Sequence, residues 1–167
     1  MTNDELINYI LAKKPDVEID IPAGTEMQLI NILEDNPSDF IDIEVHPGQL
    51  KPFMRFLKED PELAFDSLFN MTGMDWGKEL GVIYHLESRK HGHELTVRVK
   101  TGDRENPVFD TVEDLWFAAH IHECEIYDLF GIRFRGHDGL KRLFLTPGFK
   151  GYPLRKDYED DYMIIRK

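Results

Sequence analysis

The stretch from Leu80 to Lys100 decides the fold, and it reads LGVIYHLESRKHGHELTVRVK. Its last seven residues alternate between polar and apolar side chains, a period of two that is typical of a strand with one buried face. The glycine-containing tetrapeptide at 90–93 separates this strand from a β-rich one at 80–89, as in a hairpin. A third strand is predicted at 64–76, so that the three strands form an antiparallel meander.

Upstream of this meander the pattern predicts helices and two further strands. Thr2 is suited to cap a helix whose apolar residues recur at helical spacing, and Pro15 ends that helix. A second helix begins at the tripeptide 46–48 and ends at Asp60. Strands are expected at 17–21 and 40–45, and 25–36 is an ambiguous helix. Helices followed by a run of strands favour a two-layer α+β domain with the helices on one face of the sheet.

Downstream of the meander the sequence predicts a long helix at 111–130. Its stripe residues recur at alternating steps of three and four, as expected on one face of a helix, and Gly131 is suited to end it. The stripe consists of Val112, Leu115, Ala119, His122, Ile126 and Leu129. Beyond Gly131, the density of glycines, prolines and cations predicts an extended, loop-rich tail. We therefore expect one domain, an α+β body at 1–130 that continues into an extended basic docking tail at 131–167.

The charges of the 167 residues are unevenly distributed. The formal net charge is −12, but residues 1–130 carry −16 and residues 131–156 carry +6. The acidic body would repel phosphate polymers, and no nucleic-acid-binding motif accompanies the basic segment. We therefore expect the basic segment to contact another protein rather than nucleic acid.

The composition argues against several other classes of protein. With 41% hydrophobic and 31% charged residues, the chain is typical of a globular domain. Its longest apolar run is the stretch 115–119, whereas a membrane-spanning helix needs about 20 residues. The acidic start lacks the features of a secretory signal. A lone cysteine, Cys124, cannot form an internal disulfide, which favours a reducing cytoplasm.

Cofactor motifs are missing, and a metal site is the strongest alternative that the residues offer. Neither the dinucleotide fingerprint nor a phosphate-binding loop occurs, and one cysteine cannot ligate an iron–sulfur cluster. On the helix predicted at 111–130, His120, Cys124 and Asp128 fall on one face at four-residue intervals and could hold zinc. Spacing alone is weak evidence, so we expect no metal here.

The carboxylates of the same helix have a simpler structural interpretation than catalysis. Glu123 and Glu125 are two residues apart, so they diverge on a helix and cannot flank one bond. We expect these two side chains and Asp128 either to face solvent or to form ion pairs with cations that follow in the sequence. The expected partners are Arg133, Arg135 and Arg142.

Two motifs in the last third of the chain point to a family. Glu-x-Glu-x-x-Asp-Leu-Phe-Gly at 123–131 is joined to Pro-Leu-Arg-Lys-Asp at 153–157. Within residues 114–158, these motifs closely resemble the C-subunit family of NADH-quinone oxidoreductases (respiratory complex I), which includes the matching subunit of energy-converting hydrogenases. The chain departs from the family at two points. It has Cys124 in place of the usual arginine, and His120-Ile121 in place of the usual Asn-Trp.

The resemblance implies an α+β fold with a mixed, mostly antiparallel sheet and an α-β2-α-β3 core. It also implies a peripheral-arm subunit without catalytic residues, cofactor or metal of its own. The complex would pump protons and pass electrons from NADH to quinone. Expected partners are the hydrogenase-large-subunit homologue and the iron–sulfur subunits. The chain would then sit on the cytoplasmic side and reach the membrane only through the complex.

The basic tail and the adjoining helix are expected to supply the docking surface. Arginine and aromatic side chains dominate the energetics of many interfaces, which favours cations for ion pairs and aromatic residues as anchors. The expected docking residues are Glu123, Glu125, Tyr127, Asp128, Phe130, Arg133, Arg135, His137, Arg142, Phe149, Tyr152, Arg155, Lys156 and Asp157.

Two alternatives to a complex I subunit stay open at this point. One is the equivalent subunit of a membrane-bound energy-converting hydrogenase, because the electron-donor site would lie on other chains. The other belongs to a different class and is a stand-alone metal-dependent enzyme that uses His120, Cys124 and Asp128.

Overall fold

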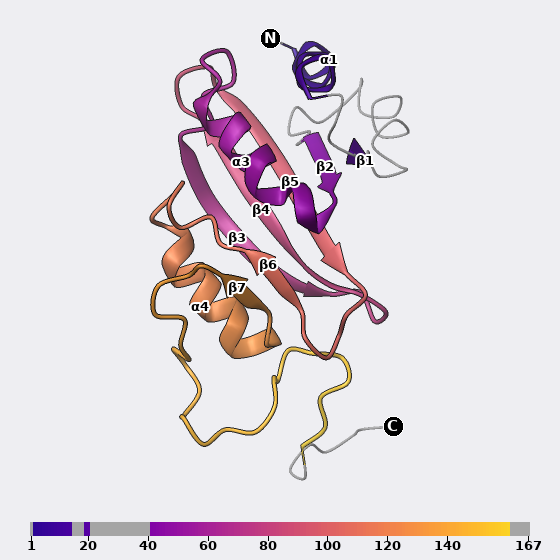
Figure 1. Cartoon of the computed structure of the whole chain (residues 1–167), viewed down its shortest axis with the longest axis vertical. Helices are drawn as coiled ribbons and strands as arrows, with labels where there is room; N and C mark the ends of the chain where they lie inside the picture. The colour runs from indigo at the N-terminus through magenta and orange to yellow at the C-terminus, as the bar shows by residue number, and fades with distance from the viewer. Residues whose placement is uncertain (1, 15–18, 21–40, 161–167) are drawn as a thin grey trace, which may run out of the picture.

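The computed structural model describes residues 2–14, 19–20 and 41–160, which form an α+β fold with helices packed on a mixed sheet (Figure 1). The main sheet has the strand order β1-β2-β5-β4-β3, and β6 and β7 form a second, two-stranded sheet. In chain order the elements are α1 (Asn3–Lys13), β1 (Ile19–Asp20), β2 (Ile41–Val45), η1 (Pro47–Gln49), α3 (Leu50–Glu59), β3 (Ser67–Asp75), β4 (Leu80–Ser88), β5 (His93–Thr101), β6 (Val108–Asp110), α4 (Ala119–Phe130) and β7 (Arg133–Arg135). None of the helices in this described part is long and apolar enough to cross a bilayer.

The predicted antiparallel meander is confirmed. β3 pairs with β4 and β4 with β5, both antiparallel, whereas β2 runs parallel to β5 and makes the sheet mixed. The predicted first helix begins after Thr2, whose hydroxyl accepts from the Glu5 N–H while the Glu5 carboxylate accepts from the Thr2 N–H. The predicted helix at 25–36 lies outside the described residues, as does the strand predicted at 17–21 apart from the backbone of β1.

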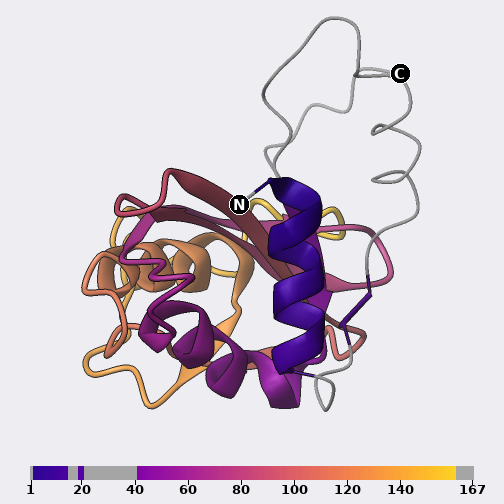
Figure 2. The ribbon, with the colours of Figure 1, turned by 90° about the horizontal axis from the view of Figure 1, so that it is seen from above.

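One face of the main sheet carries the core. Ile43, Val97, Tyr84 and Met71 lie in register across four strands, and all four are buried. α1 and α3 lie side by side over this face (Figure 2), and the Tyr9 hydroxyl of α1 donates to the carboxylate of Asp60 at the end of α3. The helices therefore cover one face of the sheet, as the pattern predicts.

The helix α4 covers the same face at the outer strand β3. In the next row of the sheet, Gly73 stands in register with Val82. A Cβ atom at Gly73 would lie 2.6 Å from the Phe130 ring and 3.1 Å from Ile126, so the glycine lets α4 approach closely. The opposite face of the sheet is polar, with an ion pair between Lys100 and Glu44 at 2.6 Å.

The helix predicted at 111–130 begins only at Ala119, so its first eight residues were wrongly predicted as helical. They form turns instead, because β6 ends at Asp110 and the Thr111 N–H still donates to the Arg135 carbonyl beside it. Val112 and Leu115 of the predicted stripe are nevertheless buried. Four of the six stripe residues are buried, whereas His122 and Leu129 are only half-buried, and the stripe does not lie on one continuous helix.

The tail is more ordered at its start than an extended loop. Gly131 ends α4 in the left-handed conformation, at φ 70°, as predicted. The chain then enters β7, which pairs in parallel with β6, and the sequence analysis did not predict this pair of strands. A Cβ atom at Gly131 would lie 2.4 Å from the Tyr152 ring, so the tail packs directly on the end of α4.

Candidate functional site: the C-terminal docking segment

Residues 131–160, which we call the C-terminal segment, comprise β7 and the loops that follow it, which run below α4 toward the yellow end of the chain in Figure 1. The buried carboxylate of Asp128 on α4 anchors this segment. Its Oδ2 atom accepts from the backbone N–H groups of residues 143, 144 and 145 at 3.0, 2.7 and 3.0 Å. Its Oδ1 atom accepts from the Arg142 guanidinium at 3.0 Å. Burial by itself would raise the pKa of Asp128, but these donors hold it below its usual value.

A second buried carboxylate, Asp75 at the end of β3, anchors the far end of the C-terminal segment. The Arg104 guanidinium donates to both of its oxygens, at 2.8 and 2.9 Å. The N–H groups of Lys156 and Gly77 donate to it at 2.9 and 2.7 Å. Arg104 also pairs with Asp157 at 2.9 Å. The bidentate bond from Arg104, helped by the two N–H donors, holds the pKa of Asp75 far below its usual value.

The Tyr152 ring joins the two anchors. The Arg142 guanidinium lies 5.1 Å from its centroid and the Arg155 guanidinium 4.9 Å from it. Arg155 also donates to the backbone carbonyls of Phe130 and Arg104. Two of the cations predicted to meet a partner are therefore engaged within the chain, where they hold the C-terminal segment against its own body.

Glu123 is buried at the N-terminal side of α4 and organises the turn before that helix. Its carboxylate accepts from the Thr111 hydroxyl at 2.6 Å and from the Val112 N–H at 2.9 Å. Burial raises the pKa of Glu123 to about 7, although both hydrogen bonds oppose that shift. Glu123 thus contacts residues of its own chain, and the arginine partner expected from the sequence is replaced by a hydroxyl and an amide.

The outer surface of the C-terminal segment combines exposed cations with exposed apolar side chains. Phe144 and Leu154 are 67% and 52% exposed, and they are two of the six exposed large apolar side chains in the described part of the chain. Among the described residues of this segment, the exposed cations are Arg133, Arg135, Lys141, Lys150 and Lys156. Exposed cations together with exposed apolar side chains suit contact with an acidic partner protein.

The residues predicted to dock divide into two groups. Glu123 and Asp128 are buried, and Arg142 and Arg155 bind groups of the same chain. The half-buried members are Glu125, Tyr127, Phe130, Phe149 and Tyr152, and the exposed members are Arg133, Arg135, Lys156 and Asp157, whereas the His137 side chain is buried. Arg135 pairs with Asp110 at 3.4 Å rather than with a carboxylate of α4.

The structure changes the metal triad that the spacing suggested. His120 and Cys124 do come together, one turn apart on α4, but Asp128 is occupied by Arg142 and three backbone N–H groups. His137, instead of Asp128, is the third residue beside His120 and Cys124. A histidine in the turn after β7 could not be placed there by helical spacing.

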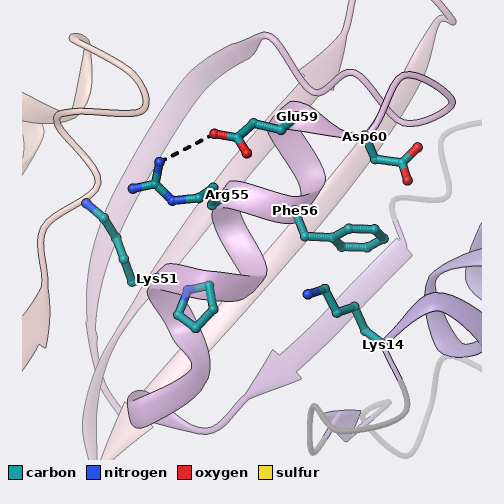
Figure 3. Close-up of a pocket in the computed structure, with 7 residues that line it drawn as sticks. Lys14, Lys51, Arg55, Phe56, Glu59 and Asp60 are labelled. Carbon is teal, nitrogen blue, oxygen red and sulfur yellow. Dashed lines mark hydrogen bonds and ion pairs between the residues drawn. The ribbon is translucent and has the colours of Figure 1, made fainter.

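A hollow between α1 and α3 is a separate surface feature (Figure 3). Its charged side chains have partners within the chain. Arg55 pairs with Glu59 at 3.4 Å, and the Lys14 ammonium lies 5.1 Å from the centroid of the Phe56 ring. Lys51 pairs with Asp114. Because the cations of this hollow already contact groups of the same chain, they do not indicate a bound ligand.

The sequence of residues 43–162 matches the family of the respiratory-chain NADH dehydrogenase 30 Kd subunit. This match extends over more than half of the chain. The chain belongs to this family. The resemblance of residues 114–158 to the C-subunit family of NADH-quinone oxidoreductases is thereby confirmed.

Two relatives of the family are about two fifths identical to this chain over the residues that align. The NADH-quinone oxidoreductase C/D-subunit of Phocaeicola vulgatus is 42% identical over 125 residues, which cover 74% of this chain and 24% of that protein. The NADH-quinone oxidoreductase C-subunit 2 of Rhizobium meliloti is 41% identical over 117 residues, which cover 68% of this chain and 63% of that protein. The chain therefore spans about a quarter of the first relative and less than two thirds of the second.

A solved structure confirms the fold of the family member described here. A chain of the archaeal membrane-bound sulfane sulfur reductase, a respiratory membrane complex, superposes with a TM-score of 0.73 at 24% sequence identity. The superposition covers 95% of this chain and 86% of that chain. At this identity the likeness establishes the fold alone.

Two residues that anchor the C-terminal segment of this family member were not predicted from the sequence. Asp75 and Arg104 hold the end of the C-terminal segment, yet each is a single charged residue next to a strand or in a loop. Their contacts with Lys156 and Asp157 join residues that are far apart in the sequence. One local feature of the sequence could have indicated a role for Asp75. It is the Asp75-Trp76-Gly77 turn, in which the Asp75 carboxylate accepts from the Gly77 N–H.

Proposed function

We propose that this chain is a non-catalytic, peripheral-arm subunit of a proton-pumping NADH-quinone oxidoreductase, located on the cytoplasmic side. Its role is to present a preformed docking surface to the subunits that hold the redox centres. Family membership supports the type of complex. The arrangement of the C-terminal segment supports the docking role.

The observation that carries the docking role is the contrast between the two sides of the C-terminal segment. On its inner side, Asp128 and Asp75 bind the backbone at 143–145 and 156. Its exposed side chains include several cations and the apolar side chains of Phe144 and Leu154. A loop that is already held in place loses little conformational entropy when a partner binds, so the anchors favour association.

The relatives named as C/D-subunits support the choice of partner. The matched segment covers only 24% of the Phocaeicola vulgatus protein and 23% of a Bacteroides fragilis one. Most of each relative is therefore a further portion joined covalently to the part that this chain matches. We infer that a unit equivalent to that portion, which the resemblance suggests is the hydrogenase-large-subunit homologue, is the main partner here.

Charge reversal on the outer side of the segment tests this proposal. Lys150→Glu and Arg133→Glu each place an anion where an acidic partner is expected. We expect roughly a tenfold fall in the amount of partner subunits that co-purify from membranes with the tagged full chain, because like charges at an interface oppose association.

The matched control is Lys78→Glu, which makes the same charge change at an exposed lysine in the turn between β3 and β4. It should leave co-purification at the level of the unmodified chain. The proposal fails if all three variants recover the same amount of partner subunits, or if Lys78→Glu alone reduces recovery.

A further inference from the structure

Three side chains with metal-binding atoms meet where α4 faces the turn after β7. His120 and Cys124 lie one helical turn apart on α4, and His137 follows Gly136, whose φ of 85° turns the chain back toward the helix. One ligand atom from each of the three residues lies within 4.8 Å of the other two. The fold thus brings together residues from two separate segments.

The three side chains are shielded from solvent to different degrees. Cys124 is fully buried, the His137 side chain is 0% exposed, and the His120 side chain is 29% exposed. Cys124 Sγ lies 3.8 Å from His137 Nε2. His137 Nδ1 is buried and has no hydrogen-bond partner in the described part of the chain. His137 Nε2, the nitrogen beside Cys124, also lies 3.0 Å from the His120 carbonyl oxygen, so a metal bound at Nε2 replaces that contact.

Acidic groups surround the cluster. Glu113 Oε2 lies 2.7 Å from His120 Nδ1 and 3.5 Å from His137 Nε2, and Glu123 Oε2 lies 3.9 Å from His137 Nε2. The other oxygen of Glu113 accepts from the Asp138 N–H at 2.7 Å, which fixes that carboxylate. A carboxylate that accepts from one ring nitrogen of a histidine leaves the other nitrogen to a metal, as around many zinc sites.

We propose that His120, Cys124 and His137 bind a zinc ion. Thiolate and imidazole ligands suit zinc, whereas magnesium and calcium prefer oxygen ligands. Tetrahedral zinc places its ligand atoms about 3.5 Å apart, so the cluster has to contract by about 1 Å. Glu113 positions His120, which then binds the metal through Nε2. The thiol proton of Cys124 is released to solvent as the zinc–sulfur bond forms.

The zinc ion joins α4 to the beginning of the C-terminal segment. Asp128 anchors residues 143–145 and Asp75 anchors residue 156, and zinc adds an attachment at His137. His120 and Cys124 also lie at the two points where the chain departs from the pattern of the family it resembles. The zinc proposal rests on the geometry of these three side chains and not on the docking role proposed above.

Metal titration of the purified full chain tests the proposal. After treatment with a chelator, the chain should bind one equivalent of zinc, and cobalt(II) in its place should give a thiolate-to-cobalt charge-transfer band. Cys124→Ser and His137→Ala should each weaken zinc binding at least a hundredfold. Glu113→Gln should weaken it about 10- to 100-fold, as is typical of residues that orient a metal ligand.

His122→Ala is the matched control, because His122 lies on the same helix outside the cluster. It should bind zinc like the unmodified chain. Circular dichroism of each metal-free variant separates loss of ligand from loss of fold, and Cys124→Ser changes the side-chain volume little. Zinc binding well below one equivalent, a cobalt complex without the thiolate band, or unchanged affinity in folded Cys124→Ser would each overturn the proposal.

Discussion

Asp128→Ala is expected to lower the free energy of unfolding by about 3 kcal/mol and to release residues 142–145 from α4. The variant removes the acceptor of three backbone N–H groups and the partner of Arg142, whose side chain is only 18% exposed. Removing one partner of a buried ion pair leaves the other charge uncompensated, which costs more than the pair contributed. Urea unfolding measures the loss, and hydrogen exchange at residues 143–145 measures the release.

Asp128→Asn should fall between alanine and the unmodified chain. Its amide oxygen can still accept from the three N–H groups, but its NH2 group then faces the Arg142 guanidinium without attraction. Glu125→Ala is the control on the same helix, and as a half-buried residue outside these contacts it should change stability by about 0.5 kcal/mol or less. Equal protection of residues 143–145 in Asp128→Ala and the unmodified chain would show that Asp128 does not anchor the segment.

The second large effect is expected from Asp75, as loss of stability in acid. Its pKa is far below the usual value in the folded chain, mainly because Arg104 donates to both oxygens. The unfolded chain, with a carboxyl pKa of about 3.9, therefore takes up a proton more readily than the folded chain. The stabilisation by Asp75 is complete above the unfolded pKa and declines as the pH falls toward the folded pKa.

Asp75→Asn should therefore be less stable at pH 7 and should lose less stability than the unmodified chain between about pH 5 and pH 3. Urea unfolding across this range measures both quantities. Glu79→Gln, at an exposed carboxylate in the next turn, should leave the pH dependence as it is. If Asp75→Asn loses stability in acid as steeply as the unmodified chain, the bonds from Arg104 are not the source of the acid sensitivity.

The sheet could be predicted from the sequence because its signals are local. Alternation at 94–100 and the glycine-containing turn at 90–93 fix a hairpin without reference to distant residues. Burial of Val112 and Leu115 could be predicted for the same reason. The start of α4 could not be predicted from local sequence. It depends on Glu123, whose carboxylate accepts from the Val112 N–H eleven residues earlier and holds that backbone in a turn.

The ion pair between Asp128 and Arg142 was among those expected from the sequence, but the other anchors of the C-terminal segment could not be predicted because backbone groups supply most of their donors. The amides at 143–145 carry no sequence signal, and the bond from the Lys156 N–H to Asp75 spans 81 residues. The distribution of charge along the sequence correctly located a basic segment. From the sequence, however, Arg142 and Arg155 were expected to be available to a partner. The structure shows that buried carboxylates, carbonyls and the Tyr152 ring already bind these two side chains.

Lysine reactivity in the assembled complex tests the docking role most directly. Brief acetylation followed by mass spectrometry compares each lysine in the isolated chain with the same lysine in the complex purified from membranes. We predict that Lys141 and Lys150, on the outer side of the C-terminal segment, react at least about ten times more slowly in the complex, since a partner covers them, while Lys78 reacts at the same rate in both. Equal rates at Lys141 and Lys150 in the two samples, or protection confined to Lys78, would contradict the docking surface proposed here.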